Sequence, residues 1–441
     1  MTTEIVGLVA VNLAYVVVGA ALLVACGWFA WYRVGVAYPL GVVATVVPAS
    51  YVALFGVPVA ITAAAVAVAL VAVALWRTWP WHVPRFGRVR VSPVAVVVFV
   101  VLAVVLAYAA RTFATRPVIE WDSWAIWLAK ARLLYDDPGA APGVLRTGTY
   151  GQAPYPLGLP TLEAVGFKAM GQYDGTVIGL QLWFLATAFP FALWSILRVR
   201  AQAWTIAFAS IAVVAAPQML FQLMTHYADV PLGLFVGLGV AAGAAWVLSG
   251  EAWLLGCFAA FFGMAGVTKS EGFLFALAGC VALLVAAGRP RLRAAGIATA
   301  AVLAVILPWR LYCSAYGLAT PDYNLGNALR PSYLRAHADR LGPTLGELAH
   351  QLGQTSSWGF LTWAVLLAFG AGILAFRWRL LAFAGTWLVL AAGGLVLTYW
   401  ISTLPTDSHL SNTSYRTIVS LLIGGASVVP LFVFPRREDA P

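Results

Sequence analysis

The sequence predicts an all-α, polytopic membrane protein, a bundle of about thirteen transmembrane helices with a GT-C-like arrangement discussed below. Of its 441 residues, 62% are hydrophobic and only 10% are charged, whereas soluble domains average about 25% charged residues. Apolar stretches approach or exceed the roughly 20 residues that cross a hydrocarbon core, for example at 58–76, 93–110, 230–248 and 380–400. The basic residues stand in short clusters between such stretches, as membrane topology signals do.

Apolar segments follow one another along the chain and define the predicted spans. We expect them near 5–32, 38–56, 58–76, 92–111, 176–197, 203–223, 230–248, 252–268, 272–288, 294–309, 358–376, 380–400 and 416–434. Prolines interrupt the second and third spans, which are short and therefore either kinked or merged. The expected parts are accessory spans (1–91), a core (92–309) containing a long loop at 112–175, a second long loop (310–357), and C-terminal spans (358–441).

Arginine clusters predict the orientation in the membrane. If the chain crosses the membrane thirteen times, all of these clusters lie on the same side of the membrane. The positive-inside rule identifies that side as the cytoplasmic one. The clusters are Arg33; Arg77, Arg85, Arg88 and Arg90; Arg198 and Arg200; Arg289, Arg291 and Arg293; Arg377 and Arg379; Arg436 and Arg437. In a plasma membrane, the N-terminus and both long loops then lie outside and the C-terminus inside. The net charge of +10 is thus a topology signal, and no nucleic-acid partner is expected.

Two carboxylates open the first long loop. Pro117 disfavours a helical residue before it, so we expect 117–121 to be extended. Alternate residues of an extended chain point the same way, which would let Glu120 and Asp122 face one ligand. The alternative is that Asp122 only caps the helix that follows.

An amphipathic helix is predicted directly after Asp122. Its apolar stripe has helical spacing and consists of Trp124, Trp127, Leu128, Ala131, Leu134 and Tyr135, while Lys130, Arg132 and Asp136 lie off it. We expect this helix to lie in the membrane interface, anchored by its tryptophans.

Four further polar groups stand at the expected outer surface. They are His226, Tyr227 and Asp229; Lys269 and Glu271; Arg310; and His409 with Arg416. The first three groups have a plainer interpretation as well: a helix start before Pro231, a solvated turn or internal ion pair at 268–272, and a snorkelling arginine at 310. Burying Lys269 or Glu271 near hydrocarbon costs roughly 2.5–3.5 kcal/mol even on the lenient insertion scale, and Arg416 stands among hydroxyl groups that suit a phosphate.

Taken in order, these motifs resemble the GT-C superfamily of membrane glycosyltransferases. The branch most similar depends on polyprenyl-phosphate sugars and includes protein mannosyltransferases and bacterial lipid A aminoarabinose transferases. The resemblance covers about 92 to 434 and rests on Glu120-x-Asp122, Tyr155-Pro156-Leu157-Gly158-Leu159-Pro160, Tyr227-Ala228-Asp229, Thr268-Lys269, Leu307-Pro308-Trp309 and the late segment with His409 and Arg416.

The resemblance implies an inverting transfer of a sugar from a polyprenyl-phosphate donor to the hydroxyl group of a glycan, lipid or protein acceptor. In such enzymes a carboxylate of the first external loop acts as the general base, a role that carries over to Asp122 or Glu120, with Asp122 favoured. Lys269, Arg310 and Arg416 become the cations that stabilise the departing phosphate, and Asp229 orients or shares the acceptor proton. His226, Tyr227, Glu271 and His409 complete the expected substrate site, for which we expect neither metal nor cofactor.

The sequence departs from that family in two ways. About three spans precede the catalytic loop, and no sizeable soluble domain follows the last span, so we expect a compact acceptor or a partner protein in its place. A transporter or lipid flippase is the competing hypothesis, and a non-catalytic assembly partner is a third. A transporter needs a site near the midplane of the bilayer, whereas the ionisable residues here gather at one surface.

Overall fold

The computed structural model describes residues 2–78, 93–150, 152–320 and 322–433. These residues are predominantly helical and form no strand, only an isolated bridge between Tyr323 and Ser402. Within them, ten helices are long and apolar enough to cross a membrane, and an eleventh span results if one bent pair is counted as a single span. The prediction of an all-α, multi-pass membrane protein is therefore confirmed.

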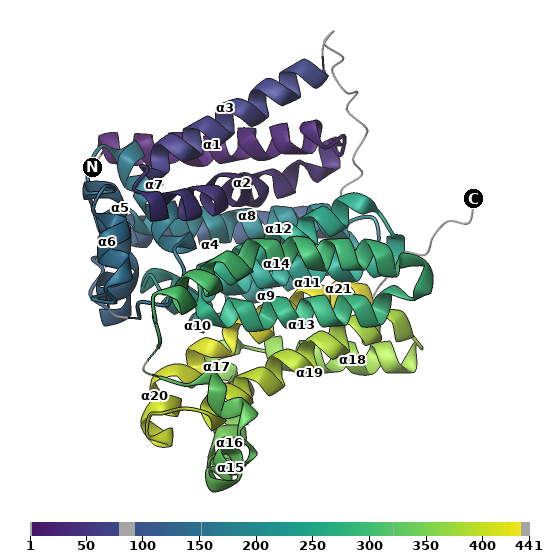
Figure 1. Ribbon diagram of the computed structural model, residues 1–441. Coiled ribbons are helices and arrows are strands. Elements are labelled where there is room, and N and C mark those ends of the chain that lie inside the picture. The colour runs from purple at the N-terminus through teal and green to yellow at the C-terminus, as the bar shows by residue number, and fades with distance from the viewer. Residues whose placement is uncertain (1, 79–92, 151, 321, 434–441) are drawn as a thin grey trace.

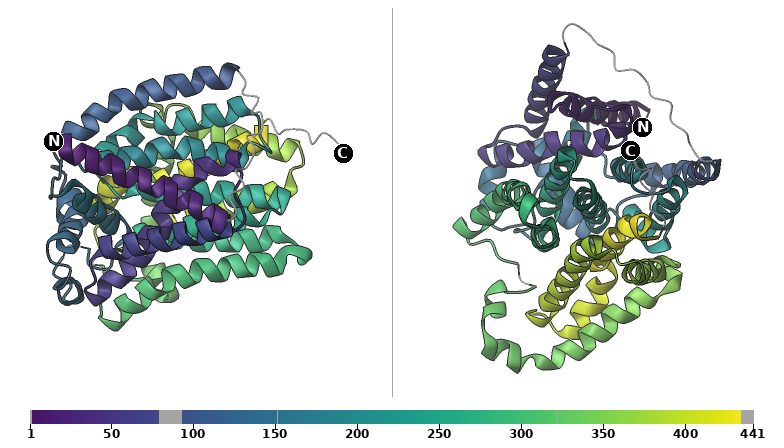
Figure 2. Two further views of the ribbon diagram at one scale, coloured as in Figure 1. Left: turned by 90° about the horizontal axis from the view of Figure 1, so that it is seen from above. Right: turned by 90° about the vertical axis from the view of Figure 1, so that its right-hand side faces the viewer.

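The long apolar helices run side by side (Figure 1), as the two turned views of Figure 2 also show. They are α1 (Thr2–Ala25), α2 (Ala37–Val52, inside the stretch Trp31–Phe55), α3 (Val59–Arg77), α4 (Pro93–Thr115), α8 (Gly179–Leu197), α11 (Asp229–Ser249), α13 (Ser270–Ala287), α14 (Leu292–Ala315), α19 (Trp378–Trp400) and the joined α20 (Thr406–Thr417) and α21 (Val419–Val433). Two apolar helices are shorter: α12 (Ala252–Thr268) and α18 (Leu361–Leu374). Short helices complete the described chain: α5 (Leu128–Asp136), α6 (Ala141–Arg146), α7 (Gly158–Met170), α15 (Pro331–Ala336), α16 (Leu341–Gly353) and α17 (Thr355–Trp358).

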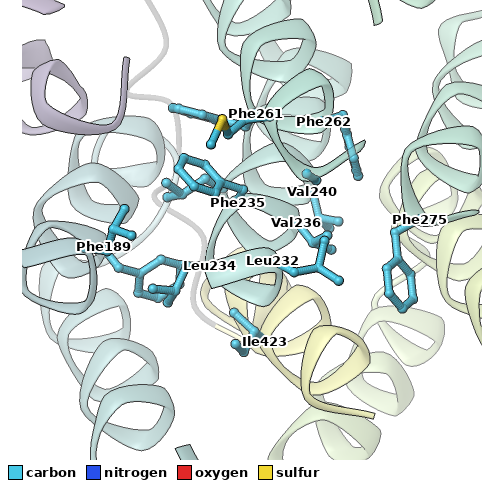
Figure 3. Packing of buried hydrophobic residues seen from close by; sticks show 14 of the residues in the cluster. Phe189, Leu232, Leu234, Phe235, Val236, Val240, Phe261, Phe262, Phe275 and Ile423 are labelled. Atoms are coloured by element: carbon cyan, nitrogen blue, oxygen red, sulfur yellow. The ribbon is translucent and has the colours of Figure 1, made fainter. Parts of the chain in front are cut away.

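Helix α11 is the centre of the bundle. Nearly all of its residues are buried, and Figure 3 shows Leu234, Phe235 and Val236 packed among side chains of the surrounding helices. Glycine allows the close approach of α21, because a Cβ added at Gly237 would lie 2.7 Å from side-chain atoms of Ile423 and Ser427. Small residues at such contacts are how membrane helices gain packing without a hydrophobic driving force between them.

Two span boundaries differ from those predicted. The predicted span 203–223 is a bent pair, α9 (Ala203–Val214) and α10 (Pro217–Met224), whose axes differ by 55°. Pro217 disfavours a helical residue before it, and Ala216 is extended (φ −60°, ψ 130°). The predicted first span, 5–32, ends at Ala25 because Gly27 takes a left-handed conformation (φ 71°), so Arg33 belongs to the next helical stretch.

The predicted last span also changes. Expected at 416–434, it is preceded by α20, and the two helices form one apolar unit from Thr406 to Val433. Arg416 thus lies inside a helical unit and is buried, with 7% of its surface exposed.

Arginine side chains gather at the end of the bundle where α11 finishes. There Arg33 forms an ion pair with Glu251, Arg291 donates to the Trp246 carbonyl, Arg77 to that of Ala25 and Arg377 to that of Leu431. The helix spans 21 residues, so this end lies about 30 Å from Asp229 at its start. Arg85, Arg88, Arg90, Arg436 and Arg437 lie outside the described residues.

Candidate functional site

A buried guanidinium joins three distant parts of the chain at the start of α11. Arg416 of α20 contacts Asp122 of the first long loop through Nη2 at 2.5 Å, and Asp229 of α11 at 3.2 Å from Nη2 and 3.3 Å from Nε. Its guanidinium carbon lies 4.0 Å from the centre of the Tyr227 ring, a cation–π distance. Arg416 is therefore held by charge on two sides and by an aromatic face on a third.

The second cation of this cluster is Lys269, between α12 and α13. Its ammonium lies 2.7 Å from Asp229 and 3.0 Å from Glu271. Burial alone lowers the pKa of Lys269, but the carboxylates of Asp229 and Glu271 raise it above its ordinary value, so the side chain stays charged. Asp229 thus bridges both cations, one with each oxygen.

We define the charge cluster as Asp122, Asp229, Lys269, Glu271 and Arg416. It contains three carboxylates and two cations, all with restricted exposure: side-chain exposed fractions are 3% for Asp229, 4% for Lys269, 9% for Arg416, 12% for Glu271 and 25% for Asp122. A buried ion pair survives desolvation only when its members keep good partners. Asp122 and Glu271, the most accessible carboxylates, are therefore the ones that a ligand can reach.

All members of the charge cluster except Asp229 line a cavity of about 190 Å³. Its polar wall comes from six stretches of the chain and consists of Asp122, Gln152, Tyr155, Lys269, Glu271, Asp322, Tyr323, Thr398, Tyr399, Ser408, His409, Asn412, Thr413, Arg416 and Thr417. Apolar side chains, among them Trp121, Ile126 and Leu395, make up the rest. A concave site with a few convergent charged groups is the usual form of a small-molecule site.

The local backbone explains how Asp122 reaches the cluster. Residues 116–120 form no helix, as the Pro117 argument predicted, but Trp121 and Asp122 already belong to the helix that continues through Ser123–Trp127, a π-helical turn. Ser123 donates a hydrogen bond to the Thr225 carbonyl just before α11. Asp122 makes no capping hydrogen bond, so the plain helix-cap interpretation does not describe it.

The helix after Asp122 is more deeply buried than expected. Trp127, Leu128, Ala131 and Leu134 of the predicted stripe are buried in the protein core, although Trp124 is exposed. Lys130, expected on the polar face, is fully buried, and its ammonium donates to the carbonyls of Gln152 (2.9 Å), Tyr155 (2.9 Å) and Ala153 (3.4 Å). The three carbonyl groups replace the hydrogen bonds to water that the Lys130 amine loses on burial. The helical spacing of the sequence does not reveal these contacts, because the carbonyl groups belong to a different segment.

Lys130 therefore holds the segment that carries Gln152 and Tyr155 into the cavity. We expect Lys130→Met to leave three carbonyls without their donor, at about 1–3 kcal/mol for each carbonyl that stays buried and unpaired. Amide hydrogen exchange in peptides covering 152–157 should become at least tenfold faster, because the segment opens more often. Arg132→Met is the control on the same helix, since its exposed pair with Asp136 contributes little. Unchanged exchange in Lys130→Met contradicts this role.

Five predicted site residues lie beside the cavity instead of lining it: Asp229, described above, and His226, Tyr227, Arg310 and Glu120. His226 is buried, and its Nε2 lies 2.7 Å from a carboxylate oxygen of Glu163 in α7. Glu163 is fully buried, and this burial raises the pKa of its carboxyl group. Tyr227 stacks on Arg416, and burial raises its pKa to about 12. Arg310 donates to the Ser270 carbonyl and covers the Phe273 ring. Glu120 is partly buried and does not line the cavity, so of the two loop carboxylates only Asp122 does.

His409 lines the cavity, as predicted, and its Nδ1 lies 2.8 Å from the Ser402 hydroxyl. Sequence reasoning missed Gln152, Asp322, Tyr323 and Tyr399 as lining residues. Gln152 donates to Asp322 across the two long loops at 2.8 Å. Polar and aromatic residues near the ends of spans are common, so nothing in the sequence distinguishes these four residues as part of a site. Tyr155 is the exception, because it stands in a motif that the resemblance already includes.

No protein-family model matches the chain, and neither the curated proteins nor the solved structures contain a match. Within the described residues, no group of three or more His, Cys, Asp or Glu side chains is arranged to hold a metal ion.

Proposed function

We propose that this protein is an inverting glycosyltransferase that moves a sugar from a polyprenyl-phosphate donor to an acceptor hydroxyl group on the extracytoplasmic side of the plasma membrane. The observation that carries the proposal is the pairing of Asp122, a partly exposed carboxylate, with Arg416, a buried cation, inside one cavity. A sugar phosphate already has a good leaving group, so catalysis needs a base for the acceptor and a cation for the phosphate.

The geometry suggests how donor binding prepares the base. In the free protein, Nη2 of Arg416 is shared between Asp122 and Asp229. A phosphate oxygen arriving in the cavity competes with Asp122 for Arg416, while the more deeply buried Asp229 keeps its two contacts with that guanidinium. Asp122 then loses its cation and becomes a stronger base for the acceptor hydroxyl. Lys269 supplies a second positive charge on the same wall.

The place of the cavity favours transfer over transport. The cluster lies at the start of α11, at the opposite end from the arginine side chains. The positive-inside rule puts those arginines in the cytoplasm, so the cavity opens toward the exterior. A transporter site belongs near the midplane, between two halves that rock around it. The topology of about thirteen spans is also part of this proposal; it counts the bent pair α9–α10 as one span and the short apolar helices α12 and α18 as two more.

Binding of the donor's lipid phosphate tests the function directly. Purified protein is titrated with polyprenyl phosphate, and we expect saturable binding that weakens at least tenfold in Arg416→Gln and in Lys269→Gln, because each loses a charge-assisted contact. Arg310→Gln is the matched control, since Arg310 lies outside the cavity wall, and should change the Kd less than twofold. No binding, or equal Kd values in all variants, removes the basis of the transferase proposal.

The orientation has its own test. Ser408 is exposed and lines the cavity, whereas Cys26 is exposed near Arg77 at the opposite end of the bundle. We expect a membrane-impermeant maleimide to label Ser408→Cys in intact cells, in a background carrying Cys26→Ser. The native Cys26 should react only after permeabilisation. The reverse pattern places the carboxylates in the cytoplasm and refutes an extracytoplasmic reaction.

A further inference from the structure

An apolar groove of about 400 Å³ lies on the far side of the bundle from the candidate cavity and shares no residue with it. Its walls are one face of α1, from Val11 to Val18, and one face of α3, from Ala60 to Val68, with Thr45 of α2. Residues Ala60, Ala63, Ala64 and Ala67 keep the α3 wall small. The groove therefore belongs to the three accessory helices that precede the core.

The groove opens toward the hydrocarbon of the bilayer. Other residues of α3 are strongly exposed, with Ile61 at 61% and Val68, on the rim of the groove, at 69%. Water is a poor occupant of an apolar space that offers it few polar partners. In a membrane, the available apolar filler of extended shape is a lipid acyl chain.

The outer end of the groove carries a positive charge. Val165, Lys168 and Ala169 of α7 close it there, and Lys168 is exposed. Helix α7 lies at the same end of the bundle as the candidate cavity: Gly158, at its start, approaches the Val267 carbonyl just before Lys269, and Ala169 meets Gly7 near the start of α1. Lys168 thus lies where the phosphates of one leaflet are found.

Tyr15 of α1 also lines the groove. Its hydroxyl group is buried away from the surface, so the wall that a ligand meets in the middle of the groove is apolar.

We propose that this groove is a binding site for one anionic phospholipid, with an acyl chain between α1 and α3 and the phosphate group at Lys168. The charge of Lys168 selects an anionic headgroup over a zwitterionic one. Bound in this way, the lipid fills the space between the accessory helices and α7, which carries Glu163 toward His226 beside the charge cluster.

The test compares phosphatidylglycerol with phosphatidylcholine of identical acyl chains, added to delipidated protein in detergent and counted by native mass spectrometry. We expect one phosphatidylglycerol to bind wild type about fivefold more tightly than phosphatidylcholine, the effect of about one basic residue at a membrane surface. Lys168→Gln should abolish that preference. Ala64→Leu fills the groove and should weaken both lipids at least tenfold, whereas Ala69→Leu, on the same helix but outside the groove, should change neither.

Each other result has a defined meaning. Equal affinities of both lipids for wild type, or a preference that Lys168→Gln retains, overturns the proposal. So does a dimer of the chain that Ala64→Leu dissociates, since the groove then holds a second copy. If Ala64→Leu fails to fold, the lipid preference of the Lys168→Gln variant, whose substitution is at an exposed position, still tests the proposal. Binding of polyprenyl phosphate at the charge cluster is measured separately, so failure of one proposal leaves the other standing.

Discussion

Asp122→Asn is expected to reduce the turnover number about 10²–10⁴-fold, the usual contribution of a general base. Donor binding should become tighter, because the phosphate no longer competes with a carboxylate at position 122 for Arg416. The amide has nearly the shape of the carboxylate but cannot accept the acceptor's proton. Turnover is followed with a radiolabelled polyprenyl-phosphate sugar and a panel of hydroxyl acceptors, once polyprenyl phosphate binding is established.

Glu120→Gln is the matched control for this result. Glu120 stands two residues away and does not line the cavity, so we expect less than a threefold loss of turnover. If Glu120→Gln abolishes transfer and Asp122→Asn does not, the base has been assigned to the wrong carboxylate. If both variants retain wild-type turnover, the loop carboxylates do not act as the base.

Asp229→Ala is expected to lower the free energy of unfolding by about 3–5 kcal/mol, the cost of leaving a buried charge without its partner. Asp229 holds Lys269 with one oxygen and Arg416 with the other, and all three side chains are buried. Its removal leaves Lys269, between α12 and α13, and Arg416 of α20 each with one carboxylate partner fewer. Unfolding in detergent, followed by circular dichroism against denaturant, measures the change.

Asp136→Ala supplies the comparison for an exposed ion pair. Asp136 pairs with Arg132 at 2.9 Å, but the two side chains are 47% and 61% exposed. Such pairs contribute about 0–1 kcal/mol, so the unfolding curve should hardly move. A similar small effect for Asp229→Ala means that water reaches the cluster, and its cations are then not held in a low-dielectric site.

The candidate site could be predicted in part, and particular residues show where prediction stops. The polar residues at 122, 229, 269, 271, 409 and 416 are predicted from their place at the expected outer surface and from the motifs of the resemblance. The structure brings all six to one cavity wall or its supporting network. The same reasoning selected His226, whose ring instead pairs with Glu163. It placed Lys130 on a polar surface, although the loop at 152–155 folds back over its ammonium.

The sequence by itself determined that this is a helical protein of the membrane, because the length and apolarity of a span depend only on neighbouring residues. It also determined which residues carry charge at the ends of the spans. Only the tertiary structure decided which of these charges meet, since Asp122, Asp229 and Arg416 are joined across 294 and 187 positions of sequence. Such pairings depend on how α11, α20 and the first loop pack, and no local pattern encodes that packing.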